Sequence, residues 1–467
     1  MSDEFSYDFV VIGGGSAGYA AARTAAGLGL QVAVIEGGGE VGGLCILRGC
    51  MPSKTLIESA NRILAAHEGE EFGVRIQGVH ADLEAVIARK RSLISGFADY
   101  RRKQLESGTF DFFRGMASFA DANRLNVQLL DGGHLVIASS YFLIATGSKS
   151  SNPDIPGLDH AATLTSDEIL DATELPHSVI VLGAGPVALE MAHYMSAMGV
   201  RVTIIQRSPH FLRGVDEDLA DTVELAFRGR GMDVYTGTKL LRVEPVGDGY
   251  RVEFEHKGQI HETGAAAVFN GLGRVPNLGF LGLENTAVTL QRGAIEVSPT
   301  QQSSAPTIFA AGDCCGPYEV VHIAIQQGEL AARNIARLLR GESASGTMDY
   351  RLKLYAVFTE PQLGVVGLSE IEAREQAIPH KVATYPFDDH GKSLVMGATR
   401  GFVKLMACPT SGEILGGAVV GPHASDLIHE VVVAMAFRST AAQFAAIPHY
   451  HPTLSEIWIY PAEELAG

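Results

Sequence analysis

Two cysteines, Cys45 and Cys50, stand five residues apart near the start of the sequence. On a regular helix this spacing keeps the thiols too far apart to bridge easily, because a disulfide needs Cα atoms within about 7 Å. Gly49 and Pro52 indicate an irregular segment instead, with a helix that begins near Pro52. Cys50 would then lie by a helix N-terminus, where a thiolate is stabilised. The pattern favours thiol–disulfide redox chemistry, with a structural disulfide or a partial metal site as the alternatives.

The segment before this pair has the form of a dinucleotide-binding βαβ unit. A β-branched run leads into Gly-Gly-Gly-Ser-Ala-Gly at residues 13–18, and an alanine-rich segment follows from Tyr19. The first and second fingerprint glycines, Gly13 and Gly15, would allow a tight turn and close approach of a pyrophosphate, and Gly18 would let the helix pack on the strand. The next strand ends at Glu36, whose carboxylate can accept hydrogen bonds from a ribose diol. An ordinary glycine turn is the alternative.

The same pattern returns in the middle of the chain. A strand over residues 178–182 precedes Gly183, Gly185 and Ala188, which occupy the three fingerprint positions, and a second strand follows over residues 201–205. Two such units predict either two bound dinucleotides or a duplicated domain.

The residues after the second unit bear on the choice of nicotinamide cofactor. Where an NAD-binding unit would carry an acid, this chain has Gln206, followed by Arg207 and, six residues later, Arg213. A carboxylate would bind the 2′-hydroxyl of NAD and repel a 2′-phosphate, whereas glutamine and arginine reverse that preference. We therefore expect NADP(H) to be favoured over NAD(H), unless both arginines are solvated surface residues.

Composition and charge exclude several classes of protein. The 467 residues are 46% hydrophobic and carry 36 basic against 53 acidic side chains, a net charge of −17 that disfavours nucleic acid as a partner. No apolar run approaches the ~18 residues of a membrane span. The apolar start over residues 9–12 follows acidic residues and no basic segment, unlike a signal peptide. Five cysteines, an odd number, fit a reducing, cytoplasmic location.

Five ordered motifs make the sequence resemble the FAD-dependent pyridine nucleotide–disulfide oxidoreductases over nearly its whole length. This family includes dihydrolipoamide dehydrogenase, glutathione reductase and mercuric reductase. The motifs are GG-x-C-x4-C-x-P-x-K from Gly42 to Lys54, Ala145-Thr146-Gly147, Gly273-Arg274-Val275-Pro276-Asn277, Phe309-Ala310-Ala311-Gly312-Asp313 and His451-Pro452-Thr453-Leu454-Ser455-Glu456.

The resemblance implies an α/β fold with two Rossmann-like dinucleotide-binding domains, for FAD and NAD(P), and a C-terminal α+β dimerisation domain. The FAD-binding domain would be discontinuous, over residues 1–150 and 274–345. The NAD(P)-binding domain would span 151–273 and the interface domain 346–467. The family also implies a homodimer with shared active sites, in which His451 of one subunit serves Cys45 of the other.

Residue roles follow from the same resemblance. Cys45 matches the interchange thiol that attacks a substrate disulfide, and Cys50 the charge-transfer thiol against the flavin. Lys54 resembles the lysine near flavin N5 and pairs with Glu190. His451 resembles the acid/base for the interchange thiol, with its imidazole oriented by Glu456. The residues expected to bind cofactors are Gly13, Gly15, Ser16, Gly18, Glu36, Gly43, Lys54, Thr146, Gly147, Asp313, Gly183, Gly185, Ala188, Gln206, Arg207, Arg213 and Gly273.

The residues indicate the substrate less directly than they indicate the family. The motif sequences look most like dihydrolipoamide dehydrogenases, which implies electron transfer between NAD(P)(H), FAD, the Cys45–Cys50 pair and a small or protein-bound dithiol or disulfide. Ser16 and Arg23 fall where glutathione reductases contact glutathione, so an NADPH-dependent reductase of a glutathione-type disulfide is an alternative, as is a mercuric-ion or quinone reductase. The adjacent Cys314 and Cys315 are expected to pack beside the flavin rather than form a second redox or metal site, and no metal-ligand spacing is present.

Overall fold

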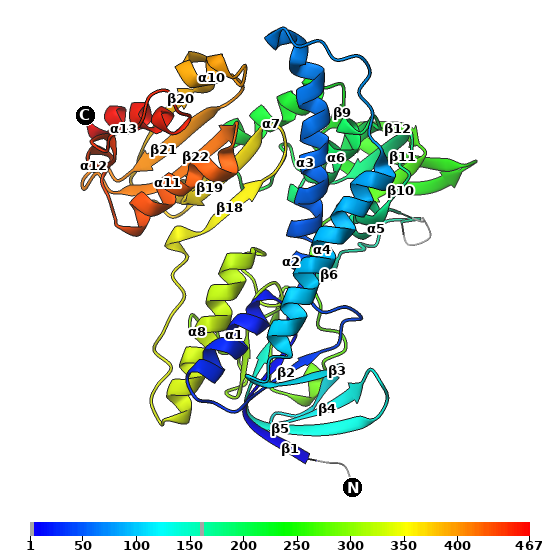
Figure 1. The fold of residues 1–467 in the computed structure, drawn as a ribbon, viewed down its shortest axis with the longest axis vertical. Helices are drawn as coiled ribbons and strands as arrows, with labels where there is room; N and C mark the ends of the chain where they lie inside the picture. Colours follow the sequence, from blue (N-terminus) through cyan, green and yellow to red (C-terminus); the bar gives the residue numbers. More distant parts are fainter. Residues whose placement is uncertain (1–3, 159–162) are drawn as a thin grey trace. The chain divides into compact units, whose positions relative to one another are not determined.

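The computed structural model of the protein describes residues 4–158 and 163–467. The chain forms two compact units (Figure 1). Unit 1 contains residues 1–53, 88–151 and 274–349, and unit 2 contains residues 54–87, 152–273 and 350–467. Residues 54–87, which the predicted FAD-binding domain includes, therefore group with unit 2, and the three-domain division stays a prediction.

A six-stranded sheet forms the centre of unit 1. Parallel pairing gives the order β3-β2-β1-β5-β17, and β4 joins β3 to β5 as an antiparallel strand. The strands are β1 (Glu4–Ile12), β2 (Val32–Glu36), β3 (Asp111–Asp121), β4 (Arg124–Leu129), β5 (His134–Ile144) and β17 (Ile308–Ala310). Both faces of β1 are buried, with Phe9 and Val11 in one apolar cluster and Val10 and Ile12 in another. A parallel strand covered on both faces reads as a continuous apolar run, which is why it could be recognised from sequence.

Helices cover this sheet and carry the cysteine pair. Helices α1 (Ser16–Gly27) and α8 (Val321–Leu339) lie side by side in Figure 1. They approach closely because Gly328 has no side chain: a Cβ there would overlap the carbonyl oxygen of Ala17. The short α2 (Gly43–Leu47) precedes α3 (Cys50–His67), and α4 (Leu83–Leu105) returns to unit 1. The smaller elements are the pairs β6 (Ser148–Ser150) with β14 (Arg274–Pro276) and β15 (Leu290–Gln291) with β16 (Ala294–Ile295).

Unit 2 contains the second predicted βαβ unit. Its parallel sheet has the order β13-β7-β8-β9. The strands are β7 (Ser178–Leu182), β8 (Arg201–Ile205), β9 (Asp233–Tyr235) and β13 (Ala267–Asn270), with helices α5 (Ser166–Asp171), α6 (Pro186–Ala197) and α7 (Glu217–Gly229). An antiparallel sheet of β10 (Thr238–Val246), β11 (Gly249–His256) and β12 (Gln259–Ala265) follows β9. The predicted strands at 178–182 and 201–205 are confirmed with the same bounds.

The C-terminal part of unit 2 is an antiparallel sheet with helices on it. Its order is β18-β19-β22-β21-β20, formed by β18 (Leu354–Val357), β19 (Gln362–Gly367), β20 (Lys381–Pro386), β21 (Phe402–Ala407) and β22 (Ile414–Gly421). The helices are α9 (Glu370–Glu375), α10 (Gly391–Val395), α11 (Ala424–Ala436), α12 (Ala441–Ala445) and α13 (Ile459–Ala466). The predicted fold class, α/β with a C-terminal α+β part, is confirmed. Among the described residues, no helix is both long and apolar enough to cross a bilayer.

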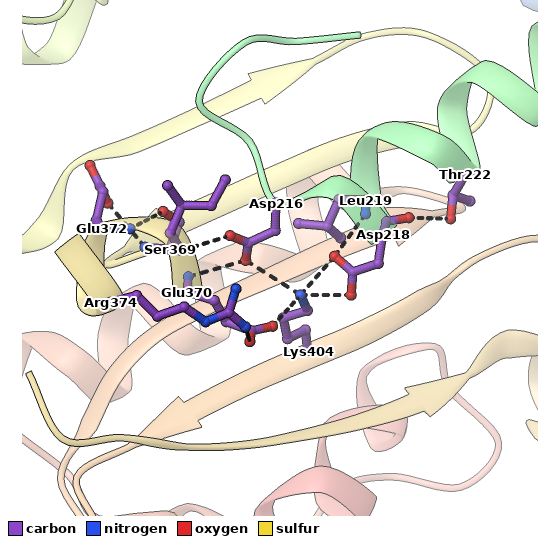
Figure 2. A network of polar contacts seen from close by, with 10 residues as sticks. Asp216, Asp218, Leu219, Thr222, Ser369, Glu370, Glu372, Arg374 and Lys404 are labelled. Atoms are coloured by element: carbon purple, nitrogen blue, oxygen red, sulfur yellow. Dashed lines mark hydrogen bonds and ion pairs between the residues drawn. The ribbon is translucent and has the colours of Figure 1, made fainter. Parts of the chain in front are cut away.

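A buried lysine joins the two parts of unit 2 (Figure 2). Nζ of Lys404, on β21, lies 3.3 Å from Asp216, 2.7 Å from Asp218 and 2.8 Å from Glu370. Asp216, immediately before α7, also accepts hydrogen bonds from the backbone N–H groups of Glu370 and Ile371 at the start of α9. Burial lowers the pKa of Lys404, but hydrogen bonds to Asp218 and Glu370 outweigh it, so the pKa lies above its ordinary 10.5. The ammonium is therefore charged at neutral pH and links α7 to the C-terminal sheet.

Candidate active site

The cysteine pair lies where α2 ends and α3 begins. Cys45 is inside α2, and Cys50 is the first residue of α3; both are half-buried. The helix thus begins two residues earlier than Pro52, where the sequence predicted its start, and Cys50 lies at the N-terminal end as expected. The chain bends between them at Gly49, where a Cβ would lie 3.3 Å from the Cα of Cys45. The helix N-terminus carries partial positive charge and favours an anion at Cys50.

The glycine turn of unit 1 provides a cradle for a dinucleotide. Gly13 has φ +107°, and a Cβ there would overlap the carbonyl oxygen of Ala145. Gly43, with φ +71°, packs against Gly15 so closely that a Cβ would lie 2.5 Å from the Gly15 Cα atom. This contact holds α2, and with it Cys45, against the first turn of α1. Gly18 packs in the same way on the carbonyl oxygen of Gly13, and Ser16 begins α1.

Two polar features of this cradle fit FAD. Oε2 of Glu36, at the end of β2, accepts a hydrogen bond of 2.8 Å from the backbone of Gly14, which places its carboxylate beside the turn. The hydroxyl oxygen of Thr146 is buried and has no partner among the described residues. A buried hydroxyl without a partner is unfavourable unless a ligand satisfies it. The residues present therefore fit a dinucleotide with a ribose diol near Glu36.

Three motifs that are far apart in sequence meet in unit 1. Ser148, directly after Gly147, donates a hydrogen bond of 2.6 Å to Oδ2 of Asp313. Nε of Arg274 donates to the Ser148 hydroxyl at 2.8 Å, and Gly273, with φ +101°, precedes it. The aspartate that is expected to bind the ribityl chain is thus held by Ser148, which in turn accepts a hydrogen bond from Arg274.

The glycine turn of unit 2 repeats the arrangement of unit 1. Gly183 follows β7 with φ +95°, and Gly185 is the N-cap of α6. Ala188 packs against Gly271, where a Cβ would lie 2.7 Å from the Ala188 methyl carbon. The absence of a side chain at Gly271 therefore makes room for an alanine at the third fingerprint position, where the usual residue is glycine. Gly185, the N-cap residue, places no side chain at this helix N-terminus, where a phosphate could bind.

The three residues expected to choose the nicotinamide cofactor follow β8. Gln206 is buried, and its amide nitrogen lies 3.5 Å from the carbonyl oxygen of His210. Arg207 and Arg213 are exposed, and neither has an ion-pair or hydrogen-bond partner within residues 4–158 and 163–467. Their guanidinium groups are thus available to an external anion.

Lys54 and Glu190 form the predicted pair within unit 2. The Lys54 Nζ atom donates to both carboxylate oxygens of Glu190, at 2.9 and 2.7 Å. The backbone N–H of Phe358 also donates to Glu190, and the Lys54 ammonium lies 4.6 Å from the centre of the Phe358 ring. The contact is the one expected, whereas Phe358 was not anticipated because it lies in the C-terminal part of the sequence.

His451 and Glu456 also lie together, and a second histidine joins them. Nδ1 of His451 lies 3.0 Å from Oε2 of Glu456, while 78% of the histidine side chain is exposed. Oε1 of the same carboxylate lies 3.4 Å from Nε2 of His390, which is fully buried. Nδ1 of His390 lies 2.8 Å from the hydroxyl of Ser393, and burial lowers the pKa of His390. Sequence reasoning missed His390 and Ser393, since no local pattern links residue 390 to residue 456.

The adjacent cysteines of unit 1 are packed as thiols. Cys314 is fully buried, and its Sγ atom donates to the carbonyl oxygens of Ile144 and Ala311, both at 3.3 Å. Hydrogen bonding with Cys314 and burial raise the pKa of Cys315 well above its ordinary value. A thiol held in its neutral form is a poor nucleophile and metal ligand, which favours the packing role. No group of three metal-ligating side chains occurs in the part of the chain that the structure describes.

Comparison with known proteins identifies the family from nearly the whole chain. Residues 7–328 match the model of the pyridine nucleotide-disulphide oxidoreductase family, and residues 354–460 match the dimerisation domain of the same family. The chain belongs to this family. It is 34% identical to dihydrolipoyl dehydrogenase of Chlamydia muridarum over 456 residues, which cover 97% of this chain and 95% of that enzyme. It is 32% identical to dihydrolipoyl dehydrogenase of Bacillus subtilis over 462 residues, covering 96% of each.

One similar solved structure is of a disulfide reductase and not of a dihydrolipoyl dehydrogenase. The Cu(II) complex of the HOCl-induced flavoprotein disulfide reductase RclA from Escherichia coli superposes with a TM-score of 0.85 at 27% identity, covering 98% of this chain and 99% of that one. Membership of the family makes this chain an FAD-dependent oxidoreductase of the pyridine nucleotide–disulfide class. Its cofactors are FAD and a nicotinamide dinucleotide, NAD(H) or NADP(H), and its dimerisation domain indicates a homodimer.

Proposed function

We propose that the protein exchanges electrons between a nicotinamide dinucleotide and a dithiol or disulfide, most like a dihydrolipoamide dehydrogenase. The observation that carries the proposal is the placement of the cysteine pair. Cys45 lies in a helix held against the dinucleotide cradle by the Gly43–Gly15 contact, and Cys50 begins the next helix. A redox pair needs this position, since its electrons must pass to or from the cofactor in the cradle.

The thiols carry out the exchange in two displacements. In the reducing direction, the Cys45 thiolate attacks one sulfur of the substrate disulfide, forming a mixed disulfide and releasing the first substrate thiolate. The protonated imidazole of His451 from a second subunit gives that thiolate its proton, while Glu456 keeps the ring oriented. The Cys50 thiolate then attacks the Cys45 sulfur, which closes the Cys45–Cys50 disulfide and releases the second thiolate.

Bound FAD supplies the two-electron link between the nicotinamide and the Cys45–Cys50 disulfide. Gly13, Gly15 and Glu36 would hold its adenosine and pyrophosphate, and Asp313 its ribityl chain. By resemblance, Lys54, oriented by Glu190, would lie near flavin N5. Overall, NAD(P)H, one proton and a disulfide are converted to NAD(P)⁺ and two thiols. Oxidation of a dihydrolipoyl group is the same reaction in the reverse direction.

A steady-state panel tests the proposal. NADH and NADPH are crossed with lipoamide, glutathione disulfide, Hg(II) and a quinone, using the purified FAD-loaded protein. We expect lipoamide turnover that Cys45→Ser abolishes. Quinone or Hg(II) turnover that survives Cys45→Ser, without turnover of any disulfide, would contradict the proposal and favour the mercuric-ion or quinone alternative.

A spectroscopic test separates the roles of the two thiols. Two-electron reduction of the FAD-loaded protein should give a long-wavelength thiolate-to-flavin charge-transfer band. Cys50→Ser should abolish this band, whereas Cys45→Ser, which keeps the Cys50 thiolate and has no disulfide to reduce, should show it before any reduction. A band that persists in Cys50→Ser would show that the two assignments are reversed.

A second candidate function is favoured by the arginines after β8. Arg207 and Arg213 are exposed, and no described residue pairs with them, as a site for a 2′-phosphate requires. This feature supports an NADPH-dependent reductase of a glutathione-type disulfide. In the same panel, this reading requires glutathione disulfide to be reduced with NADPH faster than lipoamide is reduced with NADH.

A further inference from the structure

The proposed steps do not use the guanidinium group of Arg101 in unit 1, whose charge interacts with that of Cys45. The Cζ atom of Arg101, on α4, lies 4.1 Å from the centre of the Tyr19 ring. Tyr19 is one turn along α1 from Gly15, to whose carbonyl its N–H donates. Gly15 in turn packs against Gly43 at the start of the helix that holds Cys45. Arg101 thus packs on α1, and the helix that holds Cys45 packs on the N-cap residue of the same helix.

The charge of Arg101 has no counterion in the described part of the chain. Its Nε and Nη1 atoms are buried, and no hydrogen-bond acceptor reaches either atom. Burial lowers the pKa of Arg101, whereas Tyr19 and Cys45 raise it and Arg23 lowers it further. An arginine nevertheless stays protonated in proteins, so Arg101 keeps its positive charge.

The neighbouring arginines, unlike Arg101, have carboxylate partners. Arg23 lies 6.0 Å from the Tyr19 ring but pairs with Glu329 at 3.2 Å. Arg102, the next residue on α4, is exposed and pairs with Asp99. A partly buried guanidinium without a carboxylate is unfavourable, and binding an anion there would remove that cost. Arg101 is therefore the arginine of this group whose charge an incoming ligand can compensate.

We propose that Arg101 selects anionic substrates, namely disulfides or dithiols with a carboxylate near the reacting sulfur. This inference deepens the proposed function and rests on it. Tyr19 holds the guanidinium by its ring face, and Arg101 binds the substrate carboxylate while the substrate sulfur meets Cys45. A neutral amide of the same substrate leaves the guanidinium without a counterion and binds more weakly.

Pairs of substrates that have the same skeleton and differ in charge test the selection. The kcat/KM of FAD-loaded protein is measured with lipoate against lipoamide, and with 3,3′-dithiodipropionate against its diamide. We expect Arg101→Gln to lower the acid-to-amide ratio roughly tenfold, the size of a charge-assisted hydrogen bond, and Arg101→Lys to lower it less. Arg102→Gln is the matched control, because it removes the same charge from the next position and should leave the ratio unchanged.

A second measurement does not depend on turnover. The reduced protein is alkylated with iodoacetate or iodoacetamide, and the rate at Cys45 is followed by mass spectrometry. The iodoacetate-to-iodoacetamide ratio should fall in Arg101→Gln and not in Arg102→Gln. If no disulfide is turned over but this ratio still falls, the proposed function has failed and the anion site stands.

Three results would overturn the inference. The first is an unchanged acid-to-amide ratio and alkylation ratio in Arg101→Gln. The second is an equal fall of these ratios in Arg102→Gln, which would show that the overall positive charge of α4, and not Arg101 itself, causes the effect. The third is loss of bound flavin from Arg101→Gln and Arg101→Lys with unaltered far-ultraviolet circular dichroism, which would make the guanidinium a flavin ligand.

Discussion

The carboxylate of Glu456 lies between two histidines: its Oε1 atom is 3.4 Å from Nε2 of His390, and its Oε2 atom is 3.0 Å from Nδ1 of His451. His390 is buried, its Nδ1 atom lies 2.8 Å from the Ser393 hydroxyl, and its Nε2 atom faces the carboxylate. The ring of Tyr460 contacts His390 edge-on, with centres 6.5 Å apart. Glu456 is therefore fixed from its buried side, and His451 is fixed through Glu456.

His390 should therefore act as a positioning residue for the exposed histidine. His390→Phe removes the imidazole that faces Glu456, and we expect kcat to fall roughly fivefold because the carboxylate loses this polar contact. The pH profile of kcat should also change, because His451 acts through this carboxylate. Flavin content and the charge-transfer band should not change.

The conservative variant separates positioning from packing. His390→Asn keeps an N–H donor in a smaller side chain, so it should restore much of the wild-type pH profile. A purely structural role would instead lower the folding stability in both variants and leave both pH profiles where the wild type has them. That outcome would count against the link through Glu456.

Subunit mixing tests whether two chains share each active site. His451 is exposed within its own chain, as a residue that serves a partner would be. We expect Cys45→Ser and His451→Ala homodimers to be inactive, and a mixture to recover activity, because some heterodimers hold one intact site. After random exchange about a quarter of the wild-type activity should return, since half of the dimers are mixed and each has one good site. Verified exchange without recovery would place both groups in one chain.

Lys404 should be required for the stability of unit 2. Lys404→Met leaves Asp216 buried without its ammonium partner, and breaking a buried pair from one side costs about 3 kcal/mol or more. The matched control is Lys381→Met, on the exposed surface of the neighbouring strand β20, which should change the free energy of unfolding little. Urea unfolding followed by far-ultraviolet circular dichroism measures both.

The stabilisation that Lys404 provides should depend on pH in a defined direction. The folded-state pKa of Lys404 lies above the ordinary 10.5. The stabilisation is therefore complete below pH 10.5 and is lost as the pH rises through the folded-state value. The difference between wild type and Lys404→Met should be constant from pH 7 to about 9 and shrink in strong alkali. A difference that shrinks instead on acidification from pH 8 to 6 would show that another group governs it.

The sequence predicted local elements and motif contacts better than long-range partners. Strands β7 and β8 matched their predicted bounds because apolar runs between turn signals identify them. Helix α1 begins at Ser16, whereas the alanine-rich segment was read from Tyr19, since Ser-Ala-Gly resembles a turn until the helix N-terminus is seen. The contact between Lys54 and Glu190 followed from family resemblance alone.

The partners that were missed have no local signature. His390 reaches Glu456 only because β20 is folded against α13, the helix that follows Glu456, and Lys404 meets Asp216 across 188 residues. Arg101 stands next to Arg102 in a run of charged residues, and nothing in the pattern says which of the two is buried. Burial and pairing of charges are set by tertiary packing, which one-dimensional periodicity does not contain.

NADP(H) should be preferred over NAD(H). Gln206 offers no carboxylate to repel a 2′-phosphate, and Arg207 and Arg213 are exposed without a partner among the described residues. A charged hydrogen bond to phosphate is worth about 1.5–3 kcal/mol, or roughly ten- to a hundredfold in affinity. Gln206→Glu combined with Arg207→Ala should move the ratio of kcat/KM toward NADH, whereas Arg201→Ala, which removes an exposed charge at the other end of β8, should not. A wild-type preference for NADH that the double change leaves unmoved would show that both arginines face solvent in the complex.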